Sequence, residues 1–195
     1  PLFIYSLFAL VVGIGDRWFL QSYSGSTEQG YYSFGLKFSA VIFLLSKSMT
    51  PLFMREFSIA LDKKDNAQIR NLFQNLLPQF YFITAFISIY FYLNSEIFSV
   101  LFAGNEFKGA SSSIAIMAFY PIHQALGQLS GSIYYASGRT KTYSKIGILG
   151  MITGLSLSFL LIGPENVGAL DLAAIGLALK MVINQVFMVN IQLWY

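Results

Sequence analysis

Charged side chains inside apolar stretches are the residues of this chain best suited to carry chemistry. Asp16, Arg17, Lys37 and Lys180 each lie within a run of mostly apolar residues. Counted from the nearest polar turn at about 1.5 Å per helical residue, Arg17 and Lys37 lie about 9 Å deep and Lys180 about 12 Å deep. Three cations at similar depth, with one carboxylate among them, predict a site for an anion such as pyrophosphate.

Structural roles compete with this interpretation. The side chains of Arg17 and Lys37 are long enough to bring their charges to the lipid headgroups, and Asp16 then only neutralises one of them. The same reasoning makes Lys47, near the other end of its helix, a headgroup anchor. For Lys180, both anion binding and a structural role stay open, because its depth is the only argument for a binding role.

A second polar feature is a set of residues spaced by three and four positions, which places them on one helix face. Its members are His123, Gln124, Gly127, Gln128, Gly131 and Tyr135. The face suits either close helix packing through its glycines or the lining of a polar path. His123 is the chain's single histidine and is either a hydrogen-bonded structural residue or a proton-coupling group. Lys180 and Asn184, four residues apart, extend a similar polar face on the last helix.

The composition indicates that membrane helices position these groups. Of 195 residues, 55% are hydrophobic and only 11% are charged, whereas soluble domains carry about 25% charged residues. A soluble globule of this composition would expose large apolar patches, and a disordered chain would be richer in charge. The chain has no cysteine, which excludes disulfides, thiolate metal sites and cysteine nucleophiles.

Signatures of enzymes and nucleic-acid binding are missing. The sequence contains no glycine-rich phosphate loop, no HExxH and no GxSxG motif. Its net charge of +3 is too small and too scattered for nucleic-acid recognition. We therefore expect a protein that is not an enzyme and that has no metal, cofactor or nucleic-acid partner.

Six apolar stretches have roughly the length of a bilayer-spanning helix. They are too long for barrel strands and lack period-two alternation, so the predicted fold is an all-α polytopic membrane protein. The predicted spans cover residues 2–22, 32–53, 72–93, 110–136, 146–162 and 172–191. Pro121 predicts a kink in the fourth span, and Pro51 and Pro78 fall near predicted span ends.

The positive charges predict an orientation. Seven of the twelve Lys and Arg residues fall in the second and fourth connections, at residues 55–70 and 138–145. The first, third and fifth connections, at 24–29, 94–109 and 164–171, contain only Lys108. Because positive loops stay on the cytoplasmic side, we expect both ends of the chain there. The chain begins at Pro1 without signal-peptide features, so we expect a piece of a longer protein.

Four local strings are distinctive in their order and spacing: Gly15-Asp16-Arg17-Trp18-Phe19-Leu20, Gly30-Tyr31-Tyr32-Ser33, Leu101-Phe102-Ala103-Gly104-Asn105-Glu106-Phe107 and Tyr134-Tyr135-Ala136-Ser137-Gly138-Arg139-Thr140-Lys141. Pro51 would close the second helix. This pattern resembles the C-terminal half of polysaccharide and O-antigen flippases, in the multidrug/oligosaccharidyl-lipid/polysaccharide exporter superfamily. Together the strings extend the resemblance over nearly the whole chain.

The resemblance implies one six-helix lobe of a two-lobe, about twelve-helix exporter whose N-terminal lobe is missing here. Such proteins work by alternating access and flip a lipid-linked oligosaccharide, carried on undecaprenyl pyrophosphate, across the bacterial cytoplasmic membrane during polysaccharide and lipopolysaccharide biosynthesis. By position, Arg17 and Lys37 would line the central cavity and attract the pyrophosphate. Asp16 would orient Arg17 or tune its hydration, and tyrosines and amides would contact the sugars. Membrane lipids and other polysaccharide-assembly proteins are the further partners it implies.

Three other functions remain open at this stage. A peptidoglycan-precursor flippase also moves a lipid pyrophosphate. A cation-coupled multidrug antiporter shares the fold, but it would favour an acidic cavity, whereas the predicted spans hold one acid and four bases. A scaffold helix bundle would transport nothing and needs no buried charge.

Overall fold

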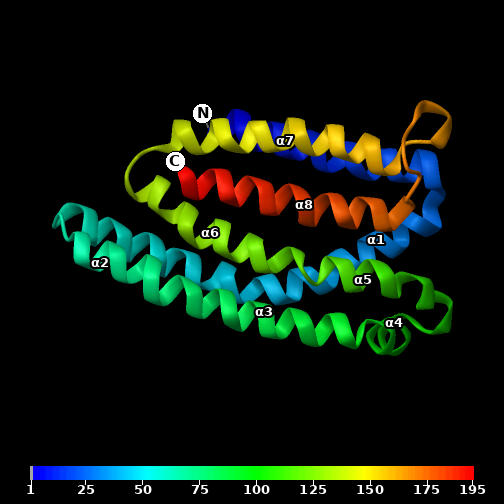
Figure 1. Cartoon of the computed structure of the whole chain (residues 1–195), viewed down its shortest axis with the longest axis horizontal. Helices are drawn as coiled ribbons and strands as arrows, with labels where there is room; N and C mark the ends of the chain where they lie inside the picture. Colours follow the sequence, from blue (N-terminus) through cyan, green and yellow to red (C-terminus); the bar gives the residue numbers. More distant parts are fainter. Residues whose placement is uncertain (1) are drawn as a thin grey trace.

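The computed structural model describes residues 2–195, and these residues form helices and turns without any strand (Figure 1). The helices are α1 (Leu2–Asp62), α2 (Asn66–Asn71), α3 (Leu77–Leu93), α4 (Ser95–Ala103), α5 (Ser111–Met117), α6 (Tyr120–Ala136), α7 (Thr140–Ile162) and α8 (Ala173–Trp194). A π-helical turn, Leu72–Leu76, joins α2 to α3, and 3-10 segments occupy Asn105–Ala110 and Glu165–Val167. The all-α prediction is confirmed.

Helix α1 consists of two limbs that meet at Gly25. This residue has φ 87° and ψ 176°, a conformation that interrupts the helix and that glycine adopts without strain. Leu20 and Tyr32 pack in one buried cluster, although a straight helix would separate them by about 18 Å. The chain therefore turns back at Gly25, between a first limb (residues 2–24) and a second limb (residues 26–62). The connection expected at 24–29 shrinks to a single non-helical residue.

The second limb extends further than the sequence predicted. Its helix continues through Pro51 to Asp62, so Pro51 lies inside the helix and does not end it. Helix α2 begins at Asn66, and the connection predicted at 55–70 shrinks to residues 63–65. A helix satisfies its own backbone hydrogen bonds, so it can continue through polar sequence after the apolar run has ended.

The predicted fourth span, residues 110–136, is broken into two helices. Helix α5 ends at Met117 and α6 begins at Tyr120, with Pro121 in its first turn, where no backbone N–H donor is needed. Within residues 2–195, four helical stretches are long and apolar enough to cross a membrane: Leu2–Asp62, Asn66–Leu93, Thr140–Ile162 and Ala173–Trp194. Such helices fit a membrane-embedded all-α protein.

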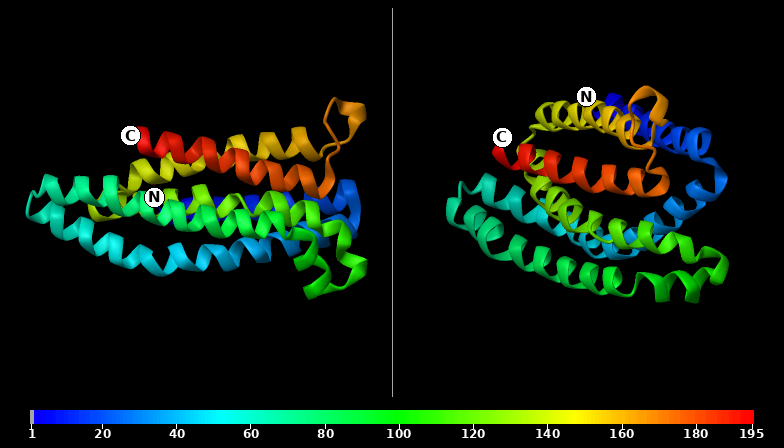
Figure 2. Two further views of the ribbon diagram at one scale, coloured as in Figure 1. Left: turned by 60° about the horizontal axis from the view of Figure 1, so that its bottom comes forward. Right: turned by 45° about the vertical axis from the view of Figure 1, so that its right-hand side comes forward.

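The two ends of the molecule differ in charge. Both termini, α2 and the α6–α7 connection lie at one end, whereas Gly25, α4 and the α7–α8 connection lie at the other (Figures 1 and 2). The first end carries seven cations: Arg55, Lys63, Lys64, Arg70, Arg139, Lys141 and Lys145. The second end carries one cation, Lys108, beside five acids: Glu28, Glu96, Glu106, Glu165 and Asp171. We call these the cation-rich end and the acid-rich end.

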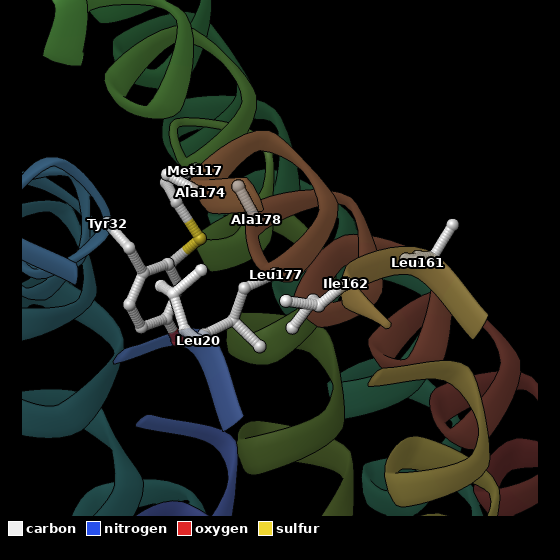
Figure 3. Close-up of a cluster of buried hydrophobic side chains, with 8 residues drawn as sticks. All are labelled: Leu20, Tyr32, Met117, Leu161, Ile162, Ala174, Leu177 and Ala178. Carbon is white, nitrogen blue, oxygen red and sulfur yellow. The ribbon is translucent and has the colours of Figure 1, made fainter. Parts of the chain in front are cut away.

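Close packing joins the two limbs of α1 to the other helices. Figure 3 shows the buried cluster at the acid-rich end, in which Tyr32 and Leu20 of α1 meet Met117 of α5 and side chains of α7 and α8. Gly35 lies directly against α5, where an added Cβ would stand 2.9 Å from the carbonyl oxygen of Ser113. Close approach of backbones through small residues is how helices associate in lipid.

Large apolar side chains cover much of the outer surface. Among those at least half exposed are Phe3, Leu10, Ile14, Trp18, Val41, Leu44, Phe82, Phe86, Ile97, Leu101, Ile152 and Phe187. In water a surface of this kind would drive aggregation, whereas in a bilayer it faces hydrocarbon. The apolar exterior is therefore suited to a lipid environment.

Candidate functional site

A buried ion pair joins α1 to α8. The Nζ atom of Lys180 lies 2.5 Å from Oδ2 of Asp16, and the two side chains are only 4% and 9% exposed. The hydroxyl of Ser158 on α7 donates to the other carboxylate oxygen, Oδ1, at 2.6 Å. Both oxygens of Asp16, the single acid in the predicted spans, are therefore satisfied by residues from two further helices.

This pairing corrects two expectations. Asp16 does not orient Arg17, because its two oxygens bind Lys180 and Ser158. Lys180 is not a free third cation, because its charge is compensated by Asp16. The reason is angular: neighbouring residues on a helix of 3.6 residues per turn point about 100° apart. Asp16 is buried between helices while Arg17 is exposed on the outside.

A partly open cavity of about 400 Å³, which we call the interior cavity, lies between the two limbs of α1, α6, α7 and α8. In Figure 2, α8 runs between two layers: the first limb of α1 and α7 lie on one side of it, and α6 lies on the other. The polar lining of the cavity consists of Lys180 and a set of tyrosines and amides: Tyr5, Gln124, Gln128, Tyr143, Asn184, Gln185 and Gln192. From the cation-rich end, where Gln192 lies, the cavity reaches to the ion pair of Lys180 near the middle of the bundle.

Hydrogen bonds satisfy some of the cavity amides. The hydroxyl of Thr153 donates to Oδ1 of Asn184 at 3.1 Å, and Nε2 of Gln192 donates to the carbonyl oxygen of Gly127 at 2.6 Å. Oε1 of Gln128 is buried without a hydrogen-bond partner. A buried acceptor of this kind needs a donor from water or a ligand, so the cavity is suited to polar contents.

The polar face predicted on α6 is divided between different neighbours. Gln124 and Gln128 line the interior cavity together with Gly127. His123 instead faces α3, where its ring lies edge-on to Tyr81 at 5.8 Å between ring centroids. His123 is therefore outside the cavity, and it is not among the groups around the ion pair.

The glycines of α6 and α7 lie at helix contacts with α8. An added Cβ at Gly127 would stand 2.6 Å from the side chain of Val189, and one at Gly131 would stand 2.9 Å from Gln192. Gly154 on α7 is similarly close to Lys180 and Asn184. The packing interpretation of these small residues therefore agrees with the structure, and it brings α6 and α7 close around the polar face of α8.

Arg17 and Lys37 differ from Lys180 in both exposure and partners. Both lie exposed on α1, and so does Lys47. Within residues 2–195, the ion pairs are the buried one of Lys180 and an exposed one between Lys108 and Glu96. Arg17 and Lys37 thus keep uncompensated positive charge on the outer surface of an apolar helix, where an anionic group can reach it.

One further contact was not predicted from the sequence. Oε2 of Glu28, in the predicted first connection, accepts a hydrogen bond from the backbone N–H of Ala174 at 3.1 Å. Ala174 lies in the first turn of α8, where backbone N–H groups lack helical partners and a carboxylate is favourable. Glu28 therefore fixes the start of α8 to the second limb of α1.

The described residues bring no three His, Asp or Glu side chains together as metal ligands. The arrangement consists instead of a compensated ion pair, a polar cavity and exposed cations of α1 that form no ion pair, among them Arg17 and Lys37. No protein-family model, no curated protein and no solved structure matches the chain, so the assignment of function rests on these features of its own residues.

Proposed function

We propose that the protein is a six-span lobe of a transporter that flips a lipid-linked oligosaccharide, carried on undecaprenyl pyrophosphate, by alternating access across the bacterial cytoplasmic membrane. The observation that carries this proposal is the pair of exposed, uncompensated cations, Arg17 and Lys37, within the apolar stretches of α1. Charge placed at this depth in a membrane is costly and is retained where it serves an ion or a charged substrate. A second lobe of the same chain would face them and close the central cavity.

The charge asymmetry of the ends supports the orientation in this proposal. The cation-rich end would lie in the cytoplasm with both termini, and the acid-rich end would face outward. The second limb of α1 extends roughly 54 Å at 1.5 Å per residue, which exceeds a hydrocarbon core of about 30 Å. Arg55, near the end of this limb, would therefore emerge on the cytoplasmic side.

The same charged residues distinguish the proposed function from the alternative ones. A multidrug antiporter needs a free carboxylate for cationic drugs, but Asp16 is already occupied by Lys180 and Ser158. A scaffold bundle accounts for the compensated pair, and in it Arg17 and Lys37 would only extend their charges to the lipid headgroups. A peptidoglycan-precursor flippase would use the same cations, because its cargo is also a lipid pyrophosphate.

The direct test is export in cells that depend on the full-length protein for surface polysaccharide. Arg17→Ala and Lys37→Ala should abolish or strongly reduce the surface polysaccharide, while Lys37→Arg should retain more export than Lys37→Ala because the charge is kept. Lys47→Ala is the matched control, since Lys47 is also an exposed lysine of α1. Undiminished export by both alanine variants at normal expression would refute the proposal.

Substrate identity is tested with purified protein in proteoliposomes. Flipping of an undecaprenyl pyrophosphate oligosaccharide should be faster than flipping of the lipid-linked peptidoglycan precursor. The opposite preference would assign the chain to the peptidoglycan-precursor function instead. Transport of a cationic dye, with neither lipid moved, would indicate the multidrug function.

A further inference from the structure

An apolar groove lies directly beside Lys37. It has a volume of about 290 Å³ and is formed by the second limb of α1, the end of α3 and helix α4. Apart from Lys37, its lining is entirely apolar: Phe34, Phe38, Val41, Phe91, Phe98 and Phe102. A single cation at the edge of a phenylalanine-lined groove forms a surface with two distinct chemical parts.

The groove is held open by ring packing. Phe38 is 9% exposed and forms its floor, with its ring centroid 5.7 Å from each of the rings of Phe91, Phe98 and Phe102. Phe91 of α3 and Phe98 of α4 stack at 4.7 Å with an interplanar angle of 19°. Aromatic pairs at such distances stabilise each other beyond their buried area, so ring packing favours the arrangement that forms the groove.

Three contacts hold helix α4 in the position where it forms one side of the groove. It is turned away from the axis of α3 (Figure 2), and the side-chain amide of Asn94 bonds to the carbonyl oxygen of Tyr90 at 2.8 Å at the turn between them. On its other side, the hydroxyl of Ser99 donates to the carbonyl oxygen of Phe107. Lys108 also binds Glu96 of α4 at 2.9 Å. The last two of these contacts hold α4 to the Asn105–Ala110 segment, and the rings of Phe98 and Phe102 pack α4 against Phe38 of the second limb.

The charge of Lys37 determines which ligand fits. In the part of the chain that the structure describes, no carboxylate lies within 4.0 Å of its Nζ atom. The complementary ligand is therefore an amphipath, with an anionic group for the ammonium and a hydrocarbon chain for the rings. Lys37 lies twelve residues beyond the turn at Gly25, about 18 Å along the helix axis at about 1.5 Å per residue, which is deeper than the phosphate of a bulk phospholipid. A phosphate drawn to this depth is expected of cargo and not of the surrounding bilayer.

We propose that this groove binds the apolar chain of a polyprenyl phosphate lipid while Lys37 binds its phosphate. The proposal rests on the proposed function, because it gives the isoprenoid chain of the cargo a defined binding site on the lobe. This site lies toward the acid-rich end, which faces the outside of the cell in the orientation proposed above. It is separate from the interior cavity, whose lining does not include Lys37.

Photolabelling tests the groove directly. The protein in nanodiscs is mixed with undecaprenyl monophosphate that carries a diazirine in the isoprene units next to the phosphate, and the labelled peptides are mapped by mass spectrometry. Labelling should fall on the groove-lining residues of α1, α3 and α4. Unlabelled undecaprenyl monophosphate should compete with the probe, whereas the same amount of phosphatidylglycerol should not.

Two pairs of matched variants sharpen the test. Lys37→Gln should weaken probe binding about tenfold, equivalent to about 1.4 kcal/mol, while Lys47→Gln on the same helix should not. Phe102→Ala in the groove should weaken binding, while Phe86→Ala on the outer surface of α3 should not. Both phenylalanines are mostly exposed, at 65% and 68%, so neither change should prevent folding.

The outcomes separate this proposal from the function on which it rests. Labelling spread over the apolar surface, equal competition by phosphatidylglycerol, or equal effects of the paired variants would show a bilayer-contact surface only and overturn the groove. Groove labelling with normal export by Arg17→Ala and Lys37→Ala would support the groove and overturn the flippase. Loss of export in those variants without groove labelling would support the flippase and overturn the groove.

Discussion

Asp16 and Arg17 are neighbours in the sequence but belong to two different regions of the molecule. Asp16 lies in the interior, where Lys180 and Ser158 satisfy both of its oxygens. Arg17 lies on the outer surface with Lys37, and neither forms an ion pair in the described chain. The comparison shows that compensation, and not depth alone, separates a charge that holds helices together from one that is free to bind a substrate.

The largest expected effect comes from breaking the interior pair. Lys180→Met leaves the carboxylate of Asp16 buried without its cation, which should lower the free energy of unfolding by about 3–5 kcal/mol. The double variant Asp16→Asn, Lys180→Met removes both charges and should recover most of that loss. Thermal unfolding of the purified protein in detergent measures both. A single variant as stable as the double one would show that the two charges do not compensate each other.

A smaller effect is expected from crowding the helix contact that supports this interior. Gly35→Ala places a Cβ 2.9 Å from the carbonyl oxygen of Ser113, and the resulting strain should cost about 1–3 kcal/mol. Gly13 offers a matched control on the other limb of α1, since nothing lies within 4 Å of its added Cβ. Gly13→Ala should be neutral or stabilise the helix by up to about 1 kcal/mol. Equal stabilities of the two variants, measured in the same unfolding assay, would contradict the close approach of α1 and α5.

The hydrogen bond from the N–H of Ala174 to Glu28, at the start of α8, should contribute less to stability than the Gly35 contact does. Glu28→Ala removes the acceptor for the N–H of Ala174 and should lower stability by about 1 kcal/mol. Glu165→Ala, an exposed acid in the α7–α8 connection, should change stability by less than about 0.5 kcal/mol. Hydrogen exchange at the first turn of α8 should rise in the first variant only. Unchanged exchange there would mean that Glu28 does not hold the start of the helix.

The smallest effect on stability is expected at the outer cations. Arg17→Ala and Lys37→Ala remove exposed charges without partners, so each should change the free energy of unfolding by less than about 0.5 kcal/mol. Detergent unfolding curves that overlay the unmodified protein would agree with this. A loss comparable to that of Lys180→Met would instead give these residues a structural role and remove the contrast between the two regions.

The sequence was sufficient to predict the helical membrane class and the approximate positions of the long apolar helices, because length and hydropathy determine both. It did not predict where helices end. The helix runs through Pro51 to Asp62, since polar residues support a helix as well as apolar ones do outside the membrane. It also did not predict that a single residue, Gly25, would reverse the chain.

The site prediction was limited because the sequence did not show which face of each helix points into the bundle. Depth along a helix can be counted from the sequence only when the turn is known, and the turn at Gly25 leaves Lys37 four residues farther from it than Arg17. The face of the helix cannot be counted in the same way, because lipid-facing and interior faces of a membrane helix are both apolar. One signal was available for the ion pair: a lone acid among four bases in the predicted spans must be compensated by one of them. Nothing comparable pointed to Ser158 or to the groove beside Lys37.

The most direct test compares two double variants of the full-length protein for both stability and polysaccharide export. Arg17→Ala, Lys37→Ala should fold with unchanged stability and fail to export. Asp16→Asn, Lys180→Met should keep most of its stability and continue to export, because the interior pair is structural. Export that survives loss of the outer cations but disappears with the neutralised interior pair would contradict the account.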